Sequence, residues 1–239
     1  MNTNRLPQVC RALEGGLIVS CQARPESPLH GPTFMAAMAR AAEIGGAVGL
    51  RVNGPNDIRA VRRVSRLPII GILKEYHKDF PVYITPTFRA AAAVVEAGAH
   101  IVALDATPRP RPGETIDVLI RRVREELRVP VMADIVTLEE GVRAAEMGAD
   151  LVATTLSGHA GGGPPPEGPD IDLAARLAAA VATPVIAEGR FWTPEQVAEV
   201  LRRGAFAVVI GTAITNPIEI TRRFAAATRI RTRAGGGGA

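Results

Sequence analysis

Residues 146–157 read EMGADLVATTLS, and this pattern of a helix end, a glycine and an apolar strand recurs along the chain. Further copies are EAGAHIVALDAT (96–107), RRGAFAVVIGTA (202–213) and, more loosely, EIGGAVGLRVN (43–53). A second pattern alternates with it, in which a proline opens an apolar strand that ends near a charge: LPIIGILK (67–74), VPVMADI (129–135) and TPVIAEG (183–189). Near-continuous apolar runs are typical of parallel strands that are covered on both faces.

Strands of this kind, each followed by an amphipathic helix, predict a single-domain (β/α)8 barrel of the TIM type. The eight expected strands are LIVSC (17–21), AVGLRV (47–52), PIIGILK (68–74), IVALDA (101–106), PVMADI (130–135), LVATTL (151–156), PVIAEG (184–189) and AVVIGT (207–212). The alternative is a doubly wound open sheet. It is disfavoured because the GxGxxG-like stretch GHAGGG (158–163) lies in a proline-rich loop and does not open a helix.

Local signals mark the ends of the helices. Glycines suited to a left-handed C-terminal position are Gly98, Gly148 and Gly204. Candidate N-caps are Thr137, Asp172 and Thr193. Glu140 and Gln196 stand three residues after the two threonines, as capping boxes require.

The barrel is expected to span residues 1–228, followed by a disordered basic and glycine-rich tail over 229–239. The stretch GHAGGGPPPEGPD (158–170) predicts a long internal loop, and whether it is a lid stays open. The segment PVYITPT (81–87) is a candidate short extra strand.

Composition argues against several classes of protein. No stretch approaches the about 18 uninterrupted apolar residues of a membrane span, and the N-terminus has no run of signal-peptide length, so a cytoplasmic protein is expected. The net charge is only +4 and the aromatic content 4%, which argues against nucleic-acid binding. Cys10 and Cys21 provide neither a disulfide framework nor metal-ligand spacing.

Lys74 ends an apolar strand in a chain with two lysines and 26 arginines. A partly buried lysine can have its pKa lowered toward neutrality, which arginine cannot. Lys74 is therefore a candidate base or Schiff-base amine. The alternative is a chance residue at a strand end, and both interpretations stay open on this residue alone. Lys78 is expected in a solvated loop.

The chemistry of such a barrel lies at the carboxyl ends of its strands. The polar residues at the eight expected ends are Ser20 and Gln22; Arg51; Lys74; Asp105; Asp134; Thr154, Thr155 and Ser157; Glu188 and Gly189; Gly211 and Thr212. Arg51 could instead pair structurally with Asp105 or Glu43, and both aspartates could cap the helices that follow them. Glu188 precedes a glycine and is favoured as functional, whereas His159 is expected to be solvent-exposed.

The expected loops after strands 7 and 8 contain glycines that let backbone N–H groups approach an anion. Gly189, Gly211 and Thr212 fit the phosphate site that many barrels place there, so a phosphorylated small molecule is the expected substrate. No expected strand ends in histidine, which makes a metal site and metal-assisted enolisation unexpected. No nucleotide, flavin or pyridoxal signature stands out.

From about Gly15 to Phe224 the chain resembles the N-acylglucosamine-6-phosphate 2-epimerases, also called N-acetylmannosamine-6-phosphate 2-epimerases. The stretches that carry the resemblance, in order, are GGLIVSCQA, GAVGLRVNGPNDI, LPIIGILK, VYITPT, VALDATPRPRP, MADIVTLEEG, TTLSGH, PVIAEGRFWTPEQ and GTAITNP. The resemblance implies cofactor-independent interconversion of N-acetylmannosamine 6-phosphate and N-acetylglucosamine 6-phosphate, in amino-sugar and sialic-acid catabolism. It also suggests a homodimer, with the helix over 217–228 as one contact.

The same resemblance implies roles for individual residues. Lys74 would move the proton at C2, and Glu188 would assist ring opening or the second proton transfer. Gln22, Arg51 and Asp134 would bind the sugar and its N-acetyl group. Thr155 is a further candidate for substrate binding, and the loops after strands 7 and 8 would hold the phosphate.

The chain departs from the family pattern in three places. The family motif ITRP is here ITNP, with Asn216 in place of an arginine that contacts phosphate; Arg190 is the candidate substitute. His159 stands where a tyrosine is common, and the loop after it is unusually rich in glycine and proline. Two other functions stay open: a Schiff-base aldolase acting on a sugar phosphate, and a sugar-phosphate-binding protein without activity.

Overall fold

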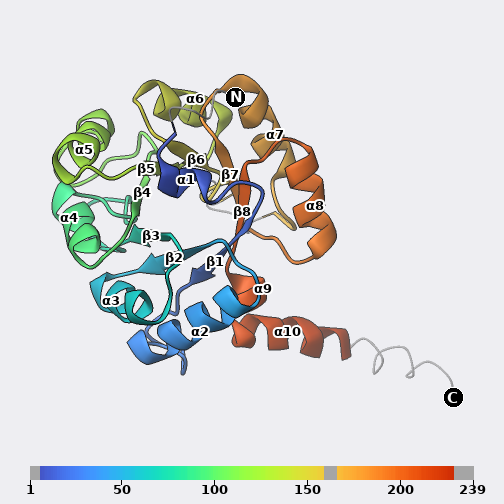
Figure 1. The fold of residues 1–239 in the computed structure, drawn as a ribbon. Coiled ribbons are helices and arrows are strands. Elements are labelled where there is room, and N and C mark those ends of the chain that lie inside the picture. The colour runs from blue at the N-terminus through green and yellow to red at the C-terminus, as the bar shows by residue number, and fades with distance from the viewer. Residues whose placement is uncertain (1–5, 159–165, 229–239) are drawn as a thin grey trace, which may run out of the picture.

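The computed structural model describes residues 6–158 and 166–228, and it is a closed barrel of eight parallel strands (Figure 1). Neighbouring strands pair in chain order, and β1 closes the ring by pairing with β8. The strands are β1 (Leu17–Cys21), β2 (Gly49–Asn53), β3 (Ile69–Ile72), β4 (Ile101–Asp105), β5 (Val131–Asp134), β6 (Leu151–Ala153), β7 (Val185–Glu188) and β8 (Ala207–Ile210). The predicted (β/α)8 architecture is confirmed.

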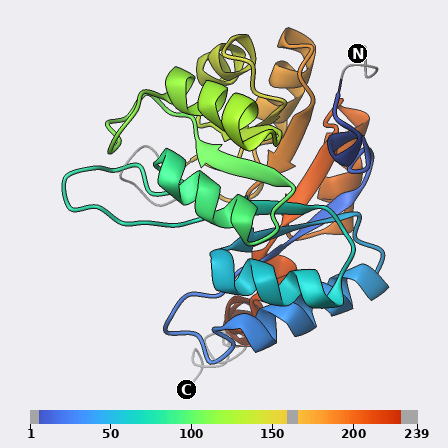
Figure 2. The same cartoon turned by 60° about the vertical axis from the view of Figure 1, so that its left-hand side comes forward.

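Helices follow the strands and lie outside the barrel, most of them packed around it (Figures 1 and 2). They are α2 (Pro32–Ile44), α3 (Pro55–Val64), α4 (Phe88–Glu96), α5 (Ile116–Arg122), α6 (Leu138–Glu146), α7 (Ile171–Ala180), α8 (Pro194–Arg202) and α10 (Pro217–Thr228). Two short helices were not expected from the sequence, α1 (Gln8–Arg11) and α9 (Thr212–Thr215). Helix α5 continues into a π-helical turn, η2 (Val123–Leu127). Among the described residues, no helix is long and apolar enough to cross a membrane.

Two apolar cores explain why the strands are apolar on both faces. The larger core lies between the strands and the surrounding helices, and the smaller one fills the barrel interior. Cys10 and Leu13, in α1 and just after it, belong to the interior core and are fully buried. The Gly15 N–H donates to the carbonyl of Phe206, which precedes β8. The N-terminal segment therefore closes the amino end of the barrel.

The predicted helix ends are mostly confirmed. Gly98, Gly148 and Gly204 have φ values of 107°, 90° and 100°, the left-handed conformation that glycine adopts without strain. Thr137 with Glu140 and Thr193 with Gln196 form capping boxes. The cap of α7 was predicted wrongly. Asp170 accepts from the Leu173 N–H at 3.0 Å, whereas Asp172 lies in the first turn and pairs with Arg203.

The long connection between β3 and α4 leaves the barrel and returns to it (Figure 2). On the return, Ile84 pairs with Lys74 as an antiparallel bridge, and its carbonyl accepts from the Asp105 N–H at 3.0 Å. The candidate extra strand over 81–87 is thus a short strand-like segment between the ends of β3 and β4. The tail expected over 229–239 and the expectation for His159 lie outside the described residues.

Candidate active site

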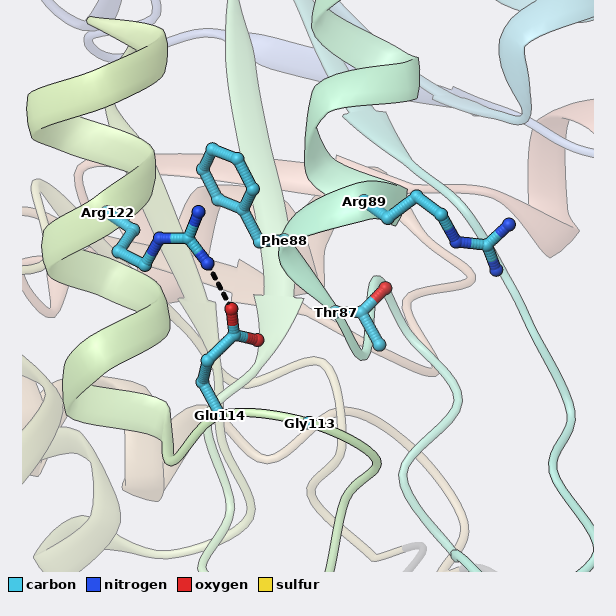
Figure 3. A pocket seen from close by; sticks show the side chains of 6 residues that line it. All are labelled: Thr87, Phe88, Arg89, Gly113, Glu114 and Arg122. Atoms are coloured by element: carbon cyan, nitrogen blue, oxygen red, sulfur yellow. Dashed lines mark hydrogen bonds and ion pairs between the residues drawn. The ribbon is translucent and has the colours of Figure 1, made fainter.

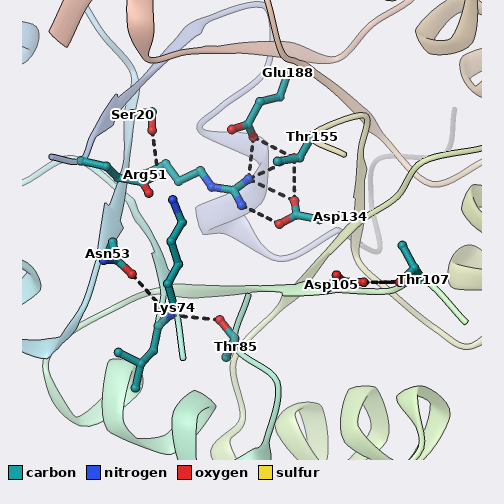
Figure 4. Close-up of polar contacts among 12 residues, drawn as sticks. Ser20, Arg51, Asn53, Lys74, Thr85, Asp105, Thr107, Asp134, Thr155 and Glu188 are labelled. Atoms are coloured by element: carbon teal, nitrogen blue, oxygen red, sulfur yellow. Dashed lines mark hydrogen bonds and ion pairs between the residues drawn. The ribbon is translucent and has the colours of Figure 1, made fainter. Parts of the chain in front are cut away.

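Charged side chains from different strands meet at the carboxyl end of the barrel (Figure 4). Arg51 comes from β2, Asp134 from β5 and Glu188 from β7, while Lys74 follows β3 by two residues. The register explains the convergence, because parallel strands in a closed barrel bring their carboxyl ends to one mouth. The structure thus brings four of the predicted site residues together.

Arg51 is the centre of this group. Its side chain is 1% exposed, and its guanidinium binds Asp134 through two contacts, Nη1–Oδ1 at 3.0 Å and Nη2–Oδ2 at 2.5 Å. Nη1 also donates to Glu188 Oε2 at 2.5 Å and to Thr155 Oγ1 at 3.2 Å. Arg51 pairs with neither Asp105 nor Glu43, so the structural pairings considered from the sequence are wrong. Such a bidentate contact fixes the plane of the guanidinium.

Glu188 is held from both its backbone and its side chain. The Thr154 hydroxyl donates to the Glu188 carbonyl and accepts from its N–H, both at 3.0 Å. The Thr155 hydroxyl lies 2.9 Å from Glu188 Oε2 and 2.7 Å from Asp134 Oδ1. A hydroxyl has one proton, so Thr155 donates to only one of the two carboxylates at a time. The carboxylate of Glu188 therefore has a defined position at the mouth.

Burial and neighbouring charges shift the pKa values of two members of this group. Burial raises the pKa of Glu188; the Arg51 cation opposes this, and the Asp134 carboxylate adds to the increase. Burial and, after it, the Arg51 cation lower the pKa of the Lys74 ammonium to about 8, while Glu188 opposes this. An acid with a raised pKa and an amine with a lowered pKa in one mouth are typical of proton-transfer sites.

Lys74 extends from the end of β3 toward the Arg51 guanidinium (Figure 4). Its backbone N–H donates to the Asn53 side-chain oxygen at 3.0 Å, which ties it to the end of β2. Asn53 was not singled out in the sequence, although its place one residue after the apolar part of a strand was a usable signal. Lys78, by contrast, is exposed on the projecting loop, as predicted.

The β1 side of the mouth holds Gln22. Its Nε2 donates to the Ser20 hydroxyl at 2.8 Å. Its Oε1 is buried and accepts no hydrogen bond from the described residues. The Nε of Arg51 is also buried and has no acceptor among them. Buried polar atoms without partners lose free energy unless a ligand or water satisfies them. Gln22 and Arg51 thus each have one unsatisfied polar atom, and their role in binding substrate stays a prediction.

Both strand-end aspartates were considered as helix caps, and this interpretation is wrong. The N-cap position of α5 is held by Thr115, whose side chain makes no capping hydrogen bond, and α6 is capped by Thr137. Asp105 is fully buried and accepts from both the N–H and the hydroxyl of Thr107, at 2.9 and 2.6 Å, and from Arg109 at 2.6 Å. It therefore shapes the loop after β4.

The residues predicted to hold an anion lie after β7 and β8. Gly189 has φ 113°, and a Cβ there would meet no atom closer than 4.0 Å. Gly211 precedes Thr212, the first residue of α9, and a Cβ on Gly211 would approach the Ser20 Cβ to 3.2 Å. The role of these glycines in phosphate binding stays a prediction.

Arg190 and Asn216 each have a structural partner. The Arg190 guanidinium donates to the carbonyls of Gly168, at 2.6 Å, and Ser157. It thereby ties the loop before α7 to the end of β7. The Asn216 side-chain oxygen accepts from the Glu219 N–H at 3.2 Å and so caps α10. Asparagine at this position thus serves a helix end.

A hollow of about 530 Å³ lies away from this charged group, between the start of α4 and the loop before α5 (Figure 3). The Arg122 guanidinium lies 3.8 Å from the Phe88 ring centroid and pairs with Glu114. Because both arginines that line the hollow are already paired, Arg122 with Glu114 and Arg89 with Glu75, this hollow is the weaker candidate. Among residues 6–158 and 166–228, no group of three or more His, Cys, Asp or Glu side chains is placed to hold a metal ion.

Comparison with known proteins shows which family the chain resembles. Residues 35–230 match the family model described as "Putative N-acetylmannosamine-6-phosphate epimerase". A relative named "Putative N-acetylmannosamine-6-phosphate 2-epimerase" from Caldanaerobacter subterraneus subsp. tengcongensis is 52% identical over 218 residues, which cover 90% of this chain and 92% of that protein. The "Bifunctional enzyme NanE/NanK" of Brucella melitensis is 46% identical over 92% of this chain and 42% of its own length.

Solved structures agree. The N-acetylmannosamine-6-phosphate 2-epimerase from Clostridium perfringens superimposes with a TM-score of 0.88 at 42% identity, covering 92% of this chain and 96% of that one. Thiamine phosphate pyrophosphorylase from Pyrococcus furiosus, at 17% identity and a TM-score of 0.59, shares the fold alone. The chain belongs to the N-acetylmannosamine-6-phosphate 2-epimerase family.

Proposed function

We propose that this protein is an isomerase that interconverts N-acetylmannosamine 6-phosphate and N-acetylglucosamine 6-phosphate, a step of amino-sugar and sialic-acid catabolism. Membership of the epimerase family supports the activity. The observation that carries the mechanism is the amine of Lys74, which has a pKa of about 8 and lies in the same mouth as the Arg51–Glu188 ion pair.

The chemistry follows from the open-chain sugar, in which C2 is adjacent to the aldehyde. Neutral Lys74 takes the C2 proton, and the C–H electron pair moves into an enolate. Return of a proton to the opposite face of C2 gives the other epimer. A base with a pKa near the working pH is the most effective for such a transfer. Donors such as the Arg51 guanidinium stabilise the negative oxygen as it forms.

Glu188 is the candidate for the second proton. Its raised pKa allows it to hold a proton and deliver it, either to the ring oxygen during opening or to the second face of C2. Gln22, Arg51, Asp134 and Thr155 are proposed to bind the sugar and its N-acetyl group. The proposed phosphate site consists of Gly189, Arg190, Gly211 and Thr212. In this site the Arg190 guanidinium acts indirectly, by holding the loop before α7 in place.

The test is NMR of N-acetylmannosamine 6-phosphate incubated with the protein in D2O. We expect the gluco epimer to accumulate with deuterium at C2. Lys74→Ala should show neither conversion nor exchange, whereas Lys78→Ala, which removes the other lysine of the chain, should match the parent. Absence of exchange in the parent would contradict the activity, and exchange by Lys74→Ala would contradict the role of Lys74.

The relatives described above are named as epimerases, which supports proton transfer over the aldolase interpretation. Borohydride separates the two reactions chemically. An imine between Lys74 and a substrate carbonyl would be reduced to a stable secondary amine, whereas simple proton transfer leaves nothing to trap. We expect the mass of the protein to be unchanged after borohydride treatment with substrate.

We further propose that the protein is a homodimer in which α10 contacts the second copy. The structure describes all of α10, and none of its residues is buried. Figure 1 shows it extending away from the barrel, and the Phe224 side chain is 72% exposed. An apolar ring of this size gains free energy when another surface covers it.

Sedimentation velocity tests the dimer. We expect a dimer for the parent and a weaker dimer for Phe224→Ala. Tyr76→Ala removes an aromatic side chain of similar exposure, 79%, from the loop between β3 and α4, and should leave the dimer intact. A monomeric parent at micromolar concentration would contradict the proposal.

The cytoplasm is the proposed compartment because a sugar phosphate does not cross a bilayer unaided, and cell fractionation would test this.

A further inference from the structure

Thr85 combines burial with an unusual backbone conformation. It has φ 44°, one of three non-glycine residues with positive φ among the described residues, and its side chain is fully buried. A β-branched residue rarely adopts the left-handed region because its side chain crowds the backbone there. Strain of this kind persists where the surroundings enforce it, and it is concentrated at functional sites.

Thr85 binds both backbone groups of Leu73, the residue directly before Lys74. The Thr85 N–H donates to the Leu73 carbonyl at 2.8 Å, and the Thr85 hydroxyl accepts from the Leu73 N–H at 3.1 Å. Leu73 needs this contact because β3 ends at Ile72, after which the chain leaves the ladder with β2. In this left-handed conformation, Thr85 presents both its N–H and its hydroxyl to the same neighbour.

The contacts on either side extend this arrangement. The Lys74 N–H donates to Asn53, and the Glu75 N–H donates to the Tyr83 carbonyl at 2.9 Å. Three consecutive amides around Lys74 thus have fixed partners, and Thr85 supplies the first. Figure 4 shows Thr85 beside the backbone from which the Lys74 side chain rises toward Arg51.

We propose that Thr85 is a positioning residue for Lys74: its strained backbone and its hydroxyl together fix Leu73, and thereby the direction and depth at which the Lys74 amine enters the mouth. The inference rests on the proton-transfer role proposed for Lys74. The strain follows from the geometry. Glycine would adopt this φ freely but has no hydroxyl, whereas threonine keeps the hydroxyl at the expense of an unfavourable conformation.

Three substitutions separate the hydroxyl from the strain. Thr85→Ser keeps the hydroxyl, Thr85→Ala loses it and keeps a Cβ at positive φ, and Thr85→Gly loses it and removes the strain. The matched control is Ser65→Ala. The buried Ser65 hydroxyl also accepts a backbone N–H, from Leu67 at 3.2 Å, but just before the opposite end of β3.

The first readout does not depend on catalysis. The chain has only two lysines, so protein labelled with 13C at the lysine ε-carbon gives two resonances, and Lys78→Arg identifies the one from Lys74. We expect the pKa of Lys74 to rise toward the ordinary lysine value in Thr85→Ala and Thr85→Gly. In Thr85→Ser and Ser65→Ala it should stay where it is in the parent.

The second readout is kinetic. We expect kcat to fall about 10- to 100-fold in Thr85→Ala and Thr85→Gly, the range expected for a misplaced catalytic group, with KM changed much less. Because the pKa of Lys74 rises in these variants, the acidic limb of the pH profile of kcat/KM should move to higher pH. Thr85→Gly should lose activity although it is at least as stable to heat as Thr85→Ala, which separates positioning from stability.

Several results would overturn the proposal. An unchanged Lys74 titration and kcat in Thr85→Gly would do so, as would equal losses in Thr85→Ser and Thr85→Ala or the same change in Ser65→Ala. If Thr85→Ala does not fold, Thr85→Gly and Thr85→Ser decide the question. Retention of C2 exchange by Lys74→Ala would remove the catalytic role of the lysine, while the NMR titration would still decide whether Thr85 positions it.

Discussion

The two ends of this barrel are built from the same eight strands, yet they bury opposite kinds of side chain. At the amino end, Cys10 and Leu13 are fully buried among apolar neighbours of the interior core. At the carboxyl end, Arg51 and Asp134 are as deeply buried but charged. The amino end gains stability from apolar burial, whereas the carboxyl end places charges where each must be neutralised by another.

The two ends should therefore respond differently to substitution. An apolar end needs volume and shape to be filled, and truncating one of its residues leaves no charge unpaired. Removing one member of a buried charge group leaves another charge without a partner. Substitutions at the amino end should therefore change stability alone, whereas those at the mouth should change activity and stability together.

The largest effect is expected at the mouth for Arg51→Ala. The substitution leaves the carboxylates of Asp134 and Glu188 without their cation, which should lower the free energy of unfolding by about 3–5 kcal/mol. Activity should fall below detection. Chemical denaturation and the D2O exchange assay measure the two effects. A variant that is inactive but as stable as the parent would show that hydration or protonation of the carboxylates compensates for the lost cation, and would weaken the comparison.

The next largest effect is expected at the amino end for Leu13→Ala. The truncation leaves a cavity in the interior core and should lower the free energy of unfolding by about 2–5 kcal/mol. Because Leu13 is at the other end of the barrel from Lys74, kcat/KM should stay within about twofold of the parent at a temperature where the variant is folded. A parallel loss of activity would show that the two ends are coupled.

A smaller effect is expected in the pH dependence of stability. The folded protein releases the Lys74 proton at about pH 8, whereas the unfolded chain holds it up to the ordinary lysine pKa of about 10.4. The unfolded state then binds more protons in this window, so Lys74 makes stability rise with pH across it. Burial raises the pKa of Cys10 and Cys21 to about 12, which acts in the opposite direction above pH 9.

A matched pair of variants isolates the lysine from the cysteines. Stability curves from pH 7 to 10 should differ between the parent and Lys74→Met, with the parent gaining more as pH rises. Lys78→Met should follow the parent, because Lys78 is exposed. Identical curves for all three proteins would mean that Lys74 titrates normally and that the mouth does not lower its pKa.

The smallest effect on stability is expected for Asn216→Ala, which alters a helix cap outside the two apolar cores. It removes the side-chain contact that caps α10, and caps are typically worth about 1 kcal/mol to their own helix. Hydrogen exchange should quicken in the first turn of α10 and stay unchanged in the strands. Faster exchange throughout the strands would mean that α10 supports the whole barrel.

Much of the barrel could be predicted because its signals are local. An apolar run of four to six residues followed by a helical period needs no knowledge of distant residues, and neither do the capping boxes at Thr137 and Thr193. The error at α7 has the same local origin. Asp170 and Asp172 are both suitable caps in sequence, and only the observed start of the helix at Ile171 distinguishes them.

The candidate site was predictable as a list of strand ends but not as a set of contacts. Lys74 and Glu188 stood out by composition and position. Two features, however, join segments far apart in the chain: the pairing of Arg51 with Asp134 and Glu188, and the use of Arg190 as a tie to the loop before α7. The unexpected α1 was missed because four helical residues carry no periodic signal.

The sequence by itself determined the strands, the helices and the end of the barrel at which charged residues gather, since these depend on hydrophobic period and chain order. The tertiary structure decided which charges meet and how deeply they are buried. It also decided that a threonine, Thr85, is forced to a positive φ to bind Leu73. The physical reason is that burial and pairing set a pKa and a conformational strain, and both are properties of neighbours brought together only when the barrel closes.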